Sequence, residues 1–427
     1  MTAATPTFEQ VAGETSVAEQ RATRAARIRA VGFFVFAAFA AYLSIGQFDV
    51  QATFSFWIDK QGGNALTLST SVGVLWVLTA ITTGAVGAVQ LVRGASFQWR
   101  RSLLIVLPFW IAATLGGLLD GKVANMTGVF AGSLALAAPI ALGAFAGILS
   151  ERSGLFNIAI EGYFLVGACT AAIIASVTGS PLVGVLAAAL AAALVGLLLA
   201  WLSIRWKVDQ IISGVVINIG ALGITNFIFL RILQHNTQLN TPPSVEVMTL
   251  PILSSIPVIG PILFTGTPYL YFTLIVMLFF SYMLYRTRWG LRLRASGEKP
   301  SAAGTVGIDV IRIRYRAMFL GGLLAGIAGS SLSLASAGSF QMEMSAGKGY
   351  IALAAVIFGA WNPIYAFGAA LVFGFADATQ ALLSILGVDV PPQVLNSVPY
   401  VVTIVVVAGV VGRVRGPAAA GQPYDQG

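Results

Sequence analysis

The sequence predicts an all-α protein that crosses a membrane about twelve times and keeps both termini in the cytoplasm. Three observations predict this fold class. The 427 residues are 57% hydrophobic and 9% charged, whereas soluble domains carry about 25% charged residues. Apolar runs of about 20 residues, the length that crosses the hydrocarbon core, recur along the whole chain. Lysine and arginine concentrate in alternate loops between these runs, as they do in cytoplasmic loops.

The predicted spans follow a polar tail, residues 1–29, whose basic end flanks the first span. The alternative for this region, a cleaved signal peptide, is disfavoured because the apolar run is long for one and no clear cleavage site follows. Residues 350–361 are apolar but too short for an ordinary span, and Asn362–Pro363 interrupts the pattern, so a short or broken span is predicted there. The spans are predicted at residues 30–48, 70–92, 102–118, 126–149, 160–178, 182–203, 210–230, 268–285, 317–335, 350–361, 364–386 and 397–412.

The distribution of charge supports this orientation. Twenty of the 24 lysine and arginine residues lie in segments that are predicted to be cytoplasmic, and the other four are Lys60, Lys122, Arg231 and Lys348. The same bias explains the net charge of +8 without a nucleic-acid partner.

Neither a metal site nor an activated nucleophile is indicated. The single cysteine, Cys169, sits in an apolar run, and the single histidine, His235, sits in a distant polar loop. This separation argues against a zinc site and a Cys/His nucleophile, and no Ser/His/Asp grouping is evident. We therefore expect no metal, no cofactor and no catalytic residue.

The most polar stretch beside a predicted span is Glu151–Gly167, which reads ERSGLFNIAIEGYFLVG. Gly154 allows a tight turn between two spans. Asn157 and Glu161 are four residues apart and are predicted to share one helix face. Two interpretations of Glu161 stay open: a local cap or a pair with Arg152, or a position with Asn157 on a translocation path, because ionisable groups are costly in hydrocarbon.

Two more polar residues lie in the middle of predicted spans. For Asn218, in the seventh span, hydrogen bonding between helices is the simpler interpretation. Asp377, in the eleventh span, should face protein or water rather than lipid. The candidate pathway residues are therefore Asn157, Glu161, Asn218 and Asp377.

The longest basic segment is the predicted cytoplasmic loop 286–316, which holds eight lysines and arginines. It is long for a connector, and Gly297, Pro300 and Gly307 are predicted to bound short helices within it. A loop that only sets the topology is one interpretation, and a docking surface for a cytoplasmic partner is the other.

Two motifs resemble one family of transport proteins. The stretch ERSGLFNIAIEGYFLVGA is similar to the signature of permease subunits of bacterial ABC importers of the nucleoside and simple-sugar type, which is close to G-L/V-x-N-I-x-x-E-G. The loop WGLRLRASGEKPSAAGTVGI resembles a second family pattern, and the C-terminal end resembles that of one type of nucleoside permease. The matching positions are Gly154, Asn157, Ile158, Glu161 and Gly162 in the first motif, and Gly290, Arg292, Arg294, Ala295, Gly297, Glu298, Pro300, Ala302, Ala303, Gly307 and Ile308 in the second.

The resemblance covers about residues 103–424 and implies a domain organisation. A permease core of about ten spans would follow an N-terminal extension of two spans, and the basic loop would dock on an ATPase. The implied segments are a cytoplasmic tail at 1–29, the extension at 30–101, the core at 102–412 with the coupling loop at 286–316, and a cytoplasmic tail at 413–427. The implied coupling residues are Gly297, Glu298, Pro300, Gly304 and Gly307.

The resemblance also implies a function and partners. The chain would form the pathway of an importer for a small polar solute, with nucleosides implied, among the lipids of the bacterial cytoplasmic membrane. It would work with an ABC ATPase, a second similar permease and an external substrate-binding lipoprotein. Because the sequence has no G-x-x-x-x-G-K-[ST] run, another chain would hydrolyse ATP. The protein is therefore predicted to be a transport subunit and not an enzyme.

Two alternatives stay open at this point. Within the same family, the solute would be a sugar or a branched-chain amino acid. In another class, a secondary transporter with twelve spans, Asp377 is the strong candidate for ion coupling. Within either class, inverted repeats are a candidate feature, because Gly347–Gly359 resembles Gly154–Gly167 in glycine spacing and is predicted on the opposite side.

Overall fold

The computed structural model describes residues 8–57, 64–119, 121–391, 393–395, 397–398, 400–401 and 415–424. Most of these residues are helical, and ten of their helices are long and apolar enough to cross a membrane. Each of the ten coincides with a predicted span, so the prediction of a polytopic helical protein is confirmed. Most of the predicted span at 397–412 lies outside the described residues, as do Lys60 and Arg413.

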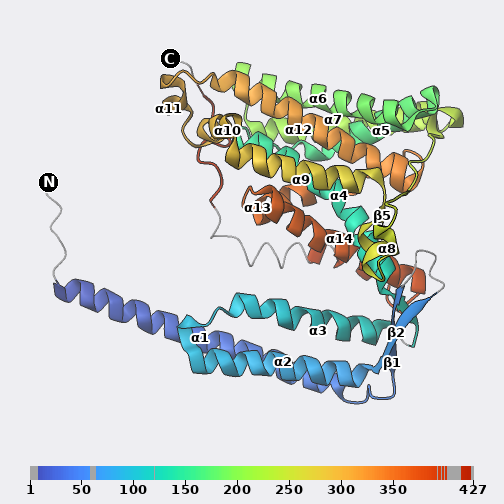
Figure 1. Cartoon of the computed structure of the whole chain (residues 1–427). Coiled ribbons are helices and arrows are strands. Elements are labelled where there is room, and N and C mark those ends of the chain that lie inside the picture. Colours follow the sequence, from blue (N-terminus) through green and yellow to red (C-terminus); the bar gives the residue numbers. More distant parts are fainter. Residues whose placement is uncertain are drawn as a thin grey trace. The chain divides into compact units, whose positions relative to one another are not determined.

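The chain folds into two compact units (Figure 1). The N-terminal unit comprises Met1–Phe56, Ala65–Met126 and Leu383–Val390, and the core unit comprises Trp57–Asn64, Thr127–Leu382 and Pro391–Gly427.

Three helices build the N-terminal unit. Its elements are α1 (Phe8–Ser44), β1 (Gln51–Trp57), β2 (Ala65–Ser71), α2 (Val72–Arg93), the 3-10 turn η1 (Gly94–Ser96), α3 (Trp99–Leu119) and β3 (Val123–Asn125). The helices pack around Ala40, Val72, Trp76 and Ala113. Because α3 packs on α2, this compact unit extends beyond residue 101, the predicted end of the extension.

The core unit carries the remaining helices. Its elements are α4 (Met126–Arg152), α5 (Ile160–Thr178), α6 (Pro181–Arg205), α7 (Gln210–Ile228), the π-helix η2 (Phe229–Leu233), the 3-10 turns η3 (Thr237–Asn240) and η4 (Leu253–Ser255), β4 (Met248–Thr249), α8 (Ile259–Leu263), β5 (Thr265–Gly266), α9 (Pro268–Arg286), α10 (Arg288–Glu298), α11 (Pro300–Thr305), α12 (Val310–Ser331), the π-helix η5 (Leu332–Ala337), α13 (Lys348–Phe358) and α14 (Pro363–Leu386).

Short strands are the departure from the all-α prediction. In the N-terminal unit β1 lies between β2 and β3, and it pairs with β3 in parallel, with Thr53 opposite Val123. In the core unit β4 and β5 form an antiparallel pair. Four of the five strands lie in segments that were predicted as loops or turns, and β2 overlaps the predicted span at 70–92 by two residues. One of them, ALTLSTS, alternates leucine with β-branched and small polar residues, a pattern that suits a strand.

The helices α12, α5 and α6 of the core unit pack closely against one another (Figure 1). Small residues allow the backbones to approach. A Cβ atom on Gly322 of α12 would lie 2.5 Å from the Cα atom of Ala193 in α6. Lipid offers no hydrophobic gain for such an interface, so its stability comes from close van der Waals packing.

Two interruptions of the helices determine where the polar groups of the core unit lie. After α4 the chain turns at Gly154, where φ is +97°, and runs without helix until α5 begins at Ile160. The predicted short span is confirmed as α13, whose 11 residues are about 16 Å long, half of the ~30 Å hydrocarbon core. The helix ends at Phe358, and Ala360 and Trp361, which follow it, have positive φ values of 50° and 55°.

Candidate functional site

The carboxylate of Glu161 lies in the first turn of α5 and joins that helix to the start of α13. It accepts hydrogen bonds from the Ser345 hydroxyl at 2.6 Å, from the Gly347 amide at 2.9 Å and from the Gly349 amide at 2.6 Å. The side chain is buried. These three donors stabilise a charge that would otherwise be costly inside the protein.

The start of α13 is suited to hold this anion. Free amides and the helix dipole make the N-terminus of a helix favourable for a carboxylate. A Cβ atom on Gly349 would lie 2.5 Å from the Cα atom of Glu161, so only glycine allows α13 to approach α5 this closely.

Asn218 of α7 joins the same two helices. Its amide oxygen accepts from the Gly162 amide at 2.8 Å, and its amide nitrogen donates to the Ile158 carbonyl oxygen at 2.9 Å and to the Tyr350 hydroxyl at 3.1 Å. The sequence interpretation of this residue as an interhelical hydrogen-bonding group is confirmed. The side chain has no unsatisfied amide group, as expected for a buried asparagine.

The cavity beside these residues measures ≈ 280 Å³. Glu161 and Asn218 form part of its wall, with the phenol ring of Tyr350 and the carboxylate of Glu343. Glu343 and Ala346 have positive φ values of 56° and 46°, a strained backbone of the kind that concentrates at functional sites. The cavity therefore offers carboxylate oxygens and an aromatic side chain to a small polar molecule.

Asn157 does not belong to this wall. It lies before the first residue of α5, so the prediction that it shares a helix face with Glu161 is wrong. Its amide nitrogen donates to the Ser150 hydroxyl at 3.1 Å and its oxygen accepts from the Ala159 amide at 3.2 Å. Both bonds brace the turn between α4 and α5, as asparagine often does in turns.

Asp377 of α14 is linked to the site through one neighbour. Its carboxylate lies 3.9 Å from the ammonium of Lys348, the first residue of α13. Both side chains are mostly buried. The carboxylate therefore pairs with a group of the protein, in line with the prediction that it faces protein or water, and this ion pair joins α14 to the start of α13.

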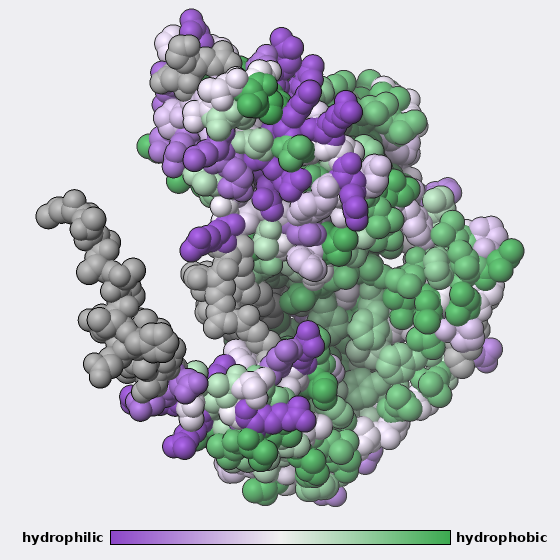
Figure 2. All heavy atoms as spheres, turned by 60° about the vertical axis from the view of Figure 1, so that its left-hand side comes forward, coloured by the Kyte–Doolittle hydropathy of each residue, from purple (hydrophilic) through white to green (hydrophobic). Residues whose placement is uncertain are grey.

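The predicted coupling loop forms α10 and α11, and hydrophilic residues gather over this end of the core unit (Figure 2). α10 packs on the turn after α4: the Ser296 hydroxyl donates to the Ser153 carbonyl oxygen at 2.9 Å. A Cβ atom on Gly297 would overlap the carbonyl oxygen of Arg152. The predicted short helices bounded by glycine and proline are confirmed.

The second half of the loop contacts the C-terminal segment. Pro300 begins α11, where its fixed φ suits a first helical position. A Cβ atom on Gly304 would lie 2.6 Å from the Tyr424 hydroxyl oxygen. Gly307 ends the helix with φ at +79°, and its amide donates to the Gly304 carbonyl oxygen at 3.0 Å. The glycines of the motif thus have structural roles in the loop.

The far end of α13 meets the same loop. The guanidinium of Arg152 donates to the carbonyl oxygens of Ala360 and Trp361 at 3.4 Å and lies 3.8 Å from the carboxylate of Glu298. The buried carboxylate of Glu151 accepts from the indole nitrogen of Trp361 at 2.6 Å. Arg152 therefore pairs with the coupling loop, and the predicted local pair with Glu161 is wrong.

Comparison with known proteins decides the family. The family profile described as "Branched-chain amino acid transport system / permease component" matches residues 133–408. The guanosine ABC transporter permease protein NupQ of Bacillus subtilis is 38% identical over 305 residues, which cover 69% of this chain and 95% of NupQ. The chain belongs to this permease family.

Two further relatives of the permease differ in the solute that their names state. The nucleoside ABC transporter permease protein NupC of Lactococcus lactis is 37% identical over 305 residues, covering 69% of this chain and 96% of NupC. The putative glucose ABC transporter permease protein TsgC13 of Haloferax volcanii is 32% identical over 306 residues, covering 65% of this chain and 92% of TsgC13. Among solved structures, none matches the permease.

Membership of the family makes the permease a multi-pass membrane subunit of an ABC transporter and not an enzyme. Permeases of such importers act with an ATPase and a binding protein. The resemblance found in the sequence is therefore confirmed, and it rested on the two motifs that the structure places at the two ends of α13.

The sequence analysis missed several groups of the permease site. The missed groups bind Glu161 or Asn218: Glu161 accepts from Ser345 and from the Gly347 and Gly349 amides, and Asn218 donates to Tyr350. Their signal was present in the S-A-G-K-G-Y run that begins the short apolar segment. Trp361 carried no signal, because a tryptophan after an apolar helix is common in membrane proteins.

Proposed function

We propose that the permease forms the translocation pathway of an ATP-driven importer for nucleosides. The observation that carries this proposal is the cavity whose wall holds Glu161, Asn218 and Tyr350. A nucleoside has a planar base that stacks on an aromatic ring and hydroxyls that donate to carboxylates. About half of the Tyr350 surface, 48%, is exposed, so its ring is accessible to a base. The names of the two most similar relatives reported above support this solute class.

α13 acts as the lever that connects ATP hydrolysis with this cavity. One end of the helix holds Glu161 through backbone amides, and the other end is held by Arg152, which pairs with Glu298 of the coupling loop. A helix of three turns moves as a rigid body, because its hydrogen bonds are internal. Movement of α10 against an ATPase would therefore shift the amides that hold Glu161 and reshape the cavity wall.

The same proposal includes the partner subunits and the membrane topology of the permease. The coupling residues Gly297, Glu298, Pro300, Gly304 and Gly307 present α10 and α11 to an ABC ATPase. A second, homologous permease completes the pathway, and an external lipoprotein delivers the solute. The chain crosses the bacterial inner membrane twelve times with both termini in the cytoplasm, and its core is built from inverted repeats.

The test is uptake of radiolabelled guanosine by cells that make the permease with its ATPase, second permease and binding lipoprotein. Uptake should stop when the ATPase carries a change that abolishes ATP hydrolysis. An excess of unlabelled adenosine should compete with guanosine, and glucose should not. Guanosine uptake that continues without ATP hydrolysis and stops with a proton ionophore would contradict the proposal and favour a secondary transporter.

A variant of the cavity sharpens this test. Tyr350→Ala should raise the KM for guanosine about tenfold or more, because stacking of a base on an aromatic ring contributes ~1–3 kcal/mol. Tyr350→Phe keeps the ring and loses only the hydroxyl that accepts from Asn218. A KM that changes equally in the two variants would exclude stacking on this ring.

A further inference from the structure

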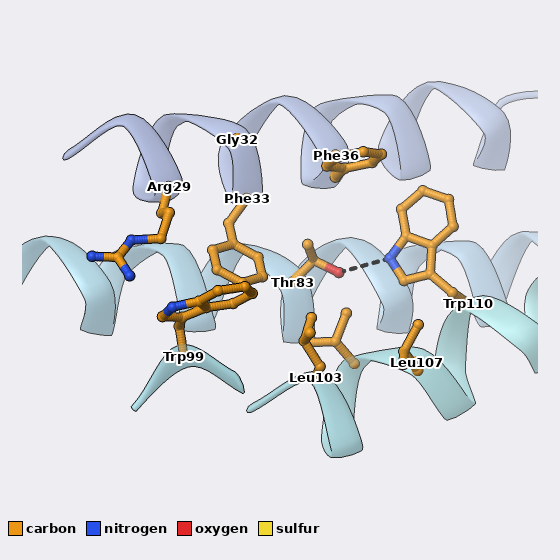
Figure 3. Close-up of a pocket in the computed structure, with 10 residues that line it drawn as sticks. Arg29, Gly32, Phe33, Phe36, Thr83, Trp99, Leu103, Leu107 and Trp110 are labelled. Atoms are coloured by element: carbon orange, nitrogen blue, oxygen red, sulfur yellow. Dashed lines mark hydrogen bonds between the residues drawn. The ribbon is translucent and has the colours of Figure 1, made fainter. Parts of the chain in front are cut away.

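The N-terminal unit contains a cavity that the proposed transport function does not use. It measures ≈ 350 Å³ and lies among α1, α2 and α3 (Figure 3). Phe33, Phe36, Leu103 and Leu107 are among the apolar side chains that line it. The hydroxyl of Thr83 accepts from the Trp110 indole at 3.1 Å, so these two polar groups satisfy each other. The interior therefore suits a hydrocarbon chain and not a nucleoside.

A cation lies at one end of this cavity. Figure 3 shows Arg29 and Trp99 together at that end, and the guanidinium carbon is 5.7 Å from the centroid of the indole ring. The Nε–H group of Arg29 donates to the Ala25 carbonyl oxygen at 3.0 Å. Within the described part of the chain, no carboxylate forms an ion pair with Arg29. Its terminal N–H groups are therefore suited to an anion from outside the protein, such as a phosphate.

The position of this end along the chain indicates the source of the anion. Arg27 on α1, Arg93 at the end of α2 and Arg101 at the start of α3 are exposed. Such arginines mark the cytoplasmic ends of spans, where the adjacent leaflet carries anionic lipids. Trp99 is also of the type that concentrates at the level of lipid headgroups.

We propose that this cavity binds one acyl chain of an anionic glycerophospholipid of the cytoplasmic leaflet, with the lipid phosphate on Arg29. The charge of Arg29 and the apolar lining of the cavity both favour this lipid. Arg29 directly precedes the predicted span at residues 30–48, which would put its guanidinium at the level of the headgroup, and the apolar interior continues from it toward Phe36 and Trp110 (Figure 3). Basic pockets between membrane helices on the cytoplasmic side are a recurrent site for anionic headgroups.

The charge half of the proposal is tested with phosphatidylglycerol and phosphatidylcholine of identical acyl chains. The full-length permease is purified in detergent, depleted of lipid and titrated with each lipid, and bound lipid is counted by native mass spectrometry. Phosphatidylglycerol should bind about tenfold more tightly than phosphatidylcholine. Arg29→Gln should abolish this preference, whereas Arg27→Gln, which removes the same charge from an exposed position of α1, should keep it.

The shape half is tested by filling the cavity. A Cβ atom on Gly32, which lines the cavity, meets no other atom within 4 Å, so Gly32→Leu should fold and occupy the space of the acyl chain. This variant should bind both lipids at least tenfold more weakly. Gly223→Leu on α7, where a Cβ atom also meets nothing within 4 Å, is the matched control. Equal binding of the two lipids, or unchanged binding by Arg29→Gln or Gly32→Leu, would overturn the proposal.

Discussion

Replacement of Glu161 by glutamine tests whether its carboxylate holds α13 in place. Glutamine keeps the size of the side chain, but it has one acceptor oxygen and turns an NH₂ group toward donors. The carboxylate accepts from Ser345, Gly347 and Gly349, and hydrogen bonds to a charged group contribute ~1.5–3 kcal/mol each, with ~0.3–1 kcal/mol from the helix dipole. Since glutamine can retain part of this set, we expect the docked position of α13 to lose about 2–4 kcal/mol.

This loss corresponds to a shift of about 30- to 700-fold in the equilibrium between docked and undocked α13. Glu161→Gln should therefore reduce the initial rate of solute uptake at least tenfold at equal amounts of permease in the membrane. It should also lower the temperature of thermal unfolding in detergent. Ser345→Ala removes one donor and should have a smaller effect. Glu19→Gln, the same chemical change at an exposed position of α1, is the control.

Two results would distinguish an anchoring role of Glu161 from direct contact with the solute. Uptake by Glu161→Gln within twofold of the wild type, with an unchanged unfolding temperature, would refute the anchoring role. Loss of uptake with an unchanged unfolding temperature would show that the carboxylate contacts the solute and does not hold α13.

Three other changes test the remaining contacts of α13 and the coupling loop. Gly297→Ala should uncouple ATP hydrolysis from uptake and weaken co-purification of the ATPase. The control is Gly220→Ala, where a Cβ atom meets nothing within 4 Å, and it should do neither. Recovery of the same amount of ATPase with the two variants would contradict this prediction. Asp377→Ala should reduce uptake more than Asn226→Ala, which changes another polar side chain of α7, two turns after Asn218. The reason is that Asp377→Ala leaves the mostly buried Lys348 ammonium without its partner. Near-normal uptake by both variants would show that the Asp377 carboxylate is dispensable. Trp361→Phe removes the indole donor to the Glu151 carboxylate at the end of α4 and should destabilise the permease by about 1–3 kcal/mol in thermal or denaturant unfolding. An unchanged stability would show that this carboxylate is satisfied in another way.

The sequence predicted the parts of the fold that depend on solvent. The length of the apolar runs predicted the spans, because each span must cross about 30 Å of hydrocarbon. The short helix α13 was predicted because its apolar run is too short to cross that distance. The break after it followed from Asn362 and Pro363, which interrupt a helical pattern. Gly297, Pro300 and Gly307 predicted the division of the coupling loop for the same local reason.

The errors arose where a local pattern was extended beyond its element. Asn157 and Glu161 share a face only if the helix includes both, and the residues between α4 and α5 are not helical. The partner of Glu161 could not be predicted either, because Ser345 is 184 residues away. Two of the three donors to Glu161 are backbone amides, which every residue but proline carries, so only the glycines beside Ser345 could signal them.

The backbone amides that bind Glu161 suit a contact between α5 and α13 that breaks and forms again during transport. A buried pair with an arginine would leave an uncompensated cation whenever α13 moved, at a cost of several kcal/mol. Backbone amides at the start of α13 are neutral, so their separation from Glu161 leaves one charge, which water in the adjoining cavity can solvate. Arg152 is instead paired with Glu298, whose side chain is about half exposed, although Arg152 itself is mostly buried. The ion pair of Arg152 is thus partly screened by solvent through Glu298, whereas neutral backbone amides hold the Glu161 carboxylate beside the proposed pathway.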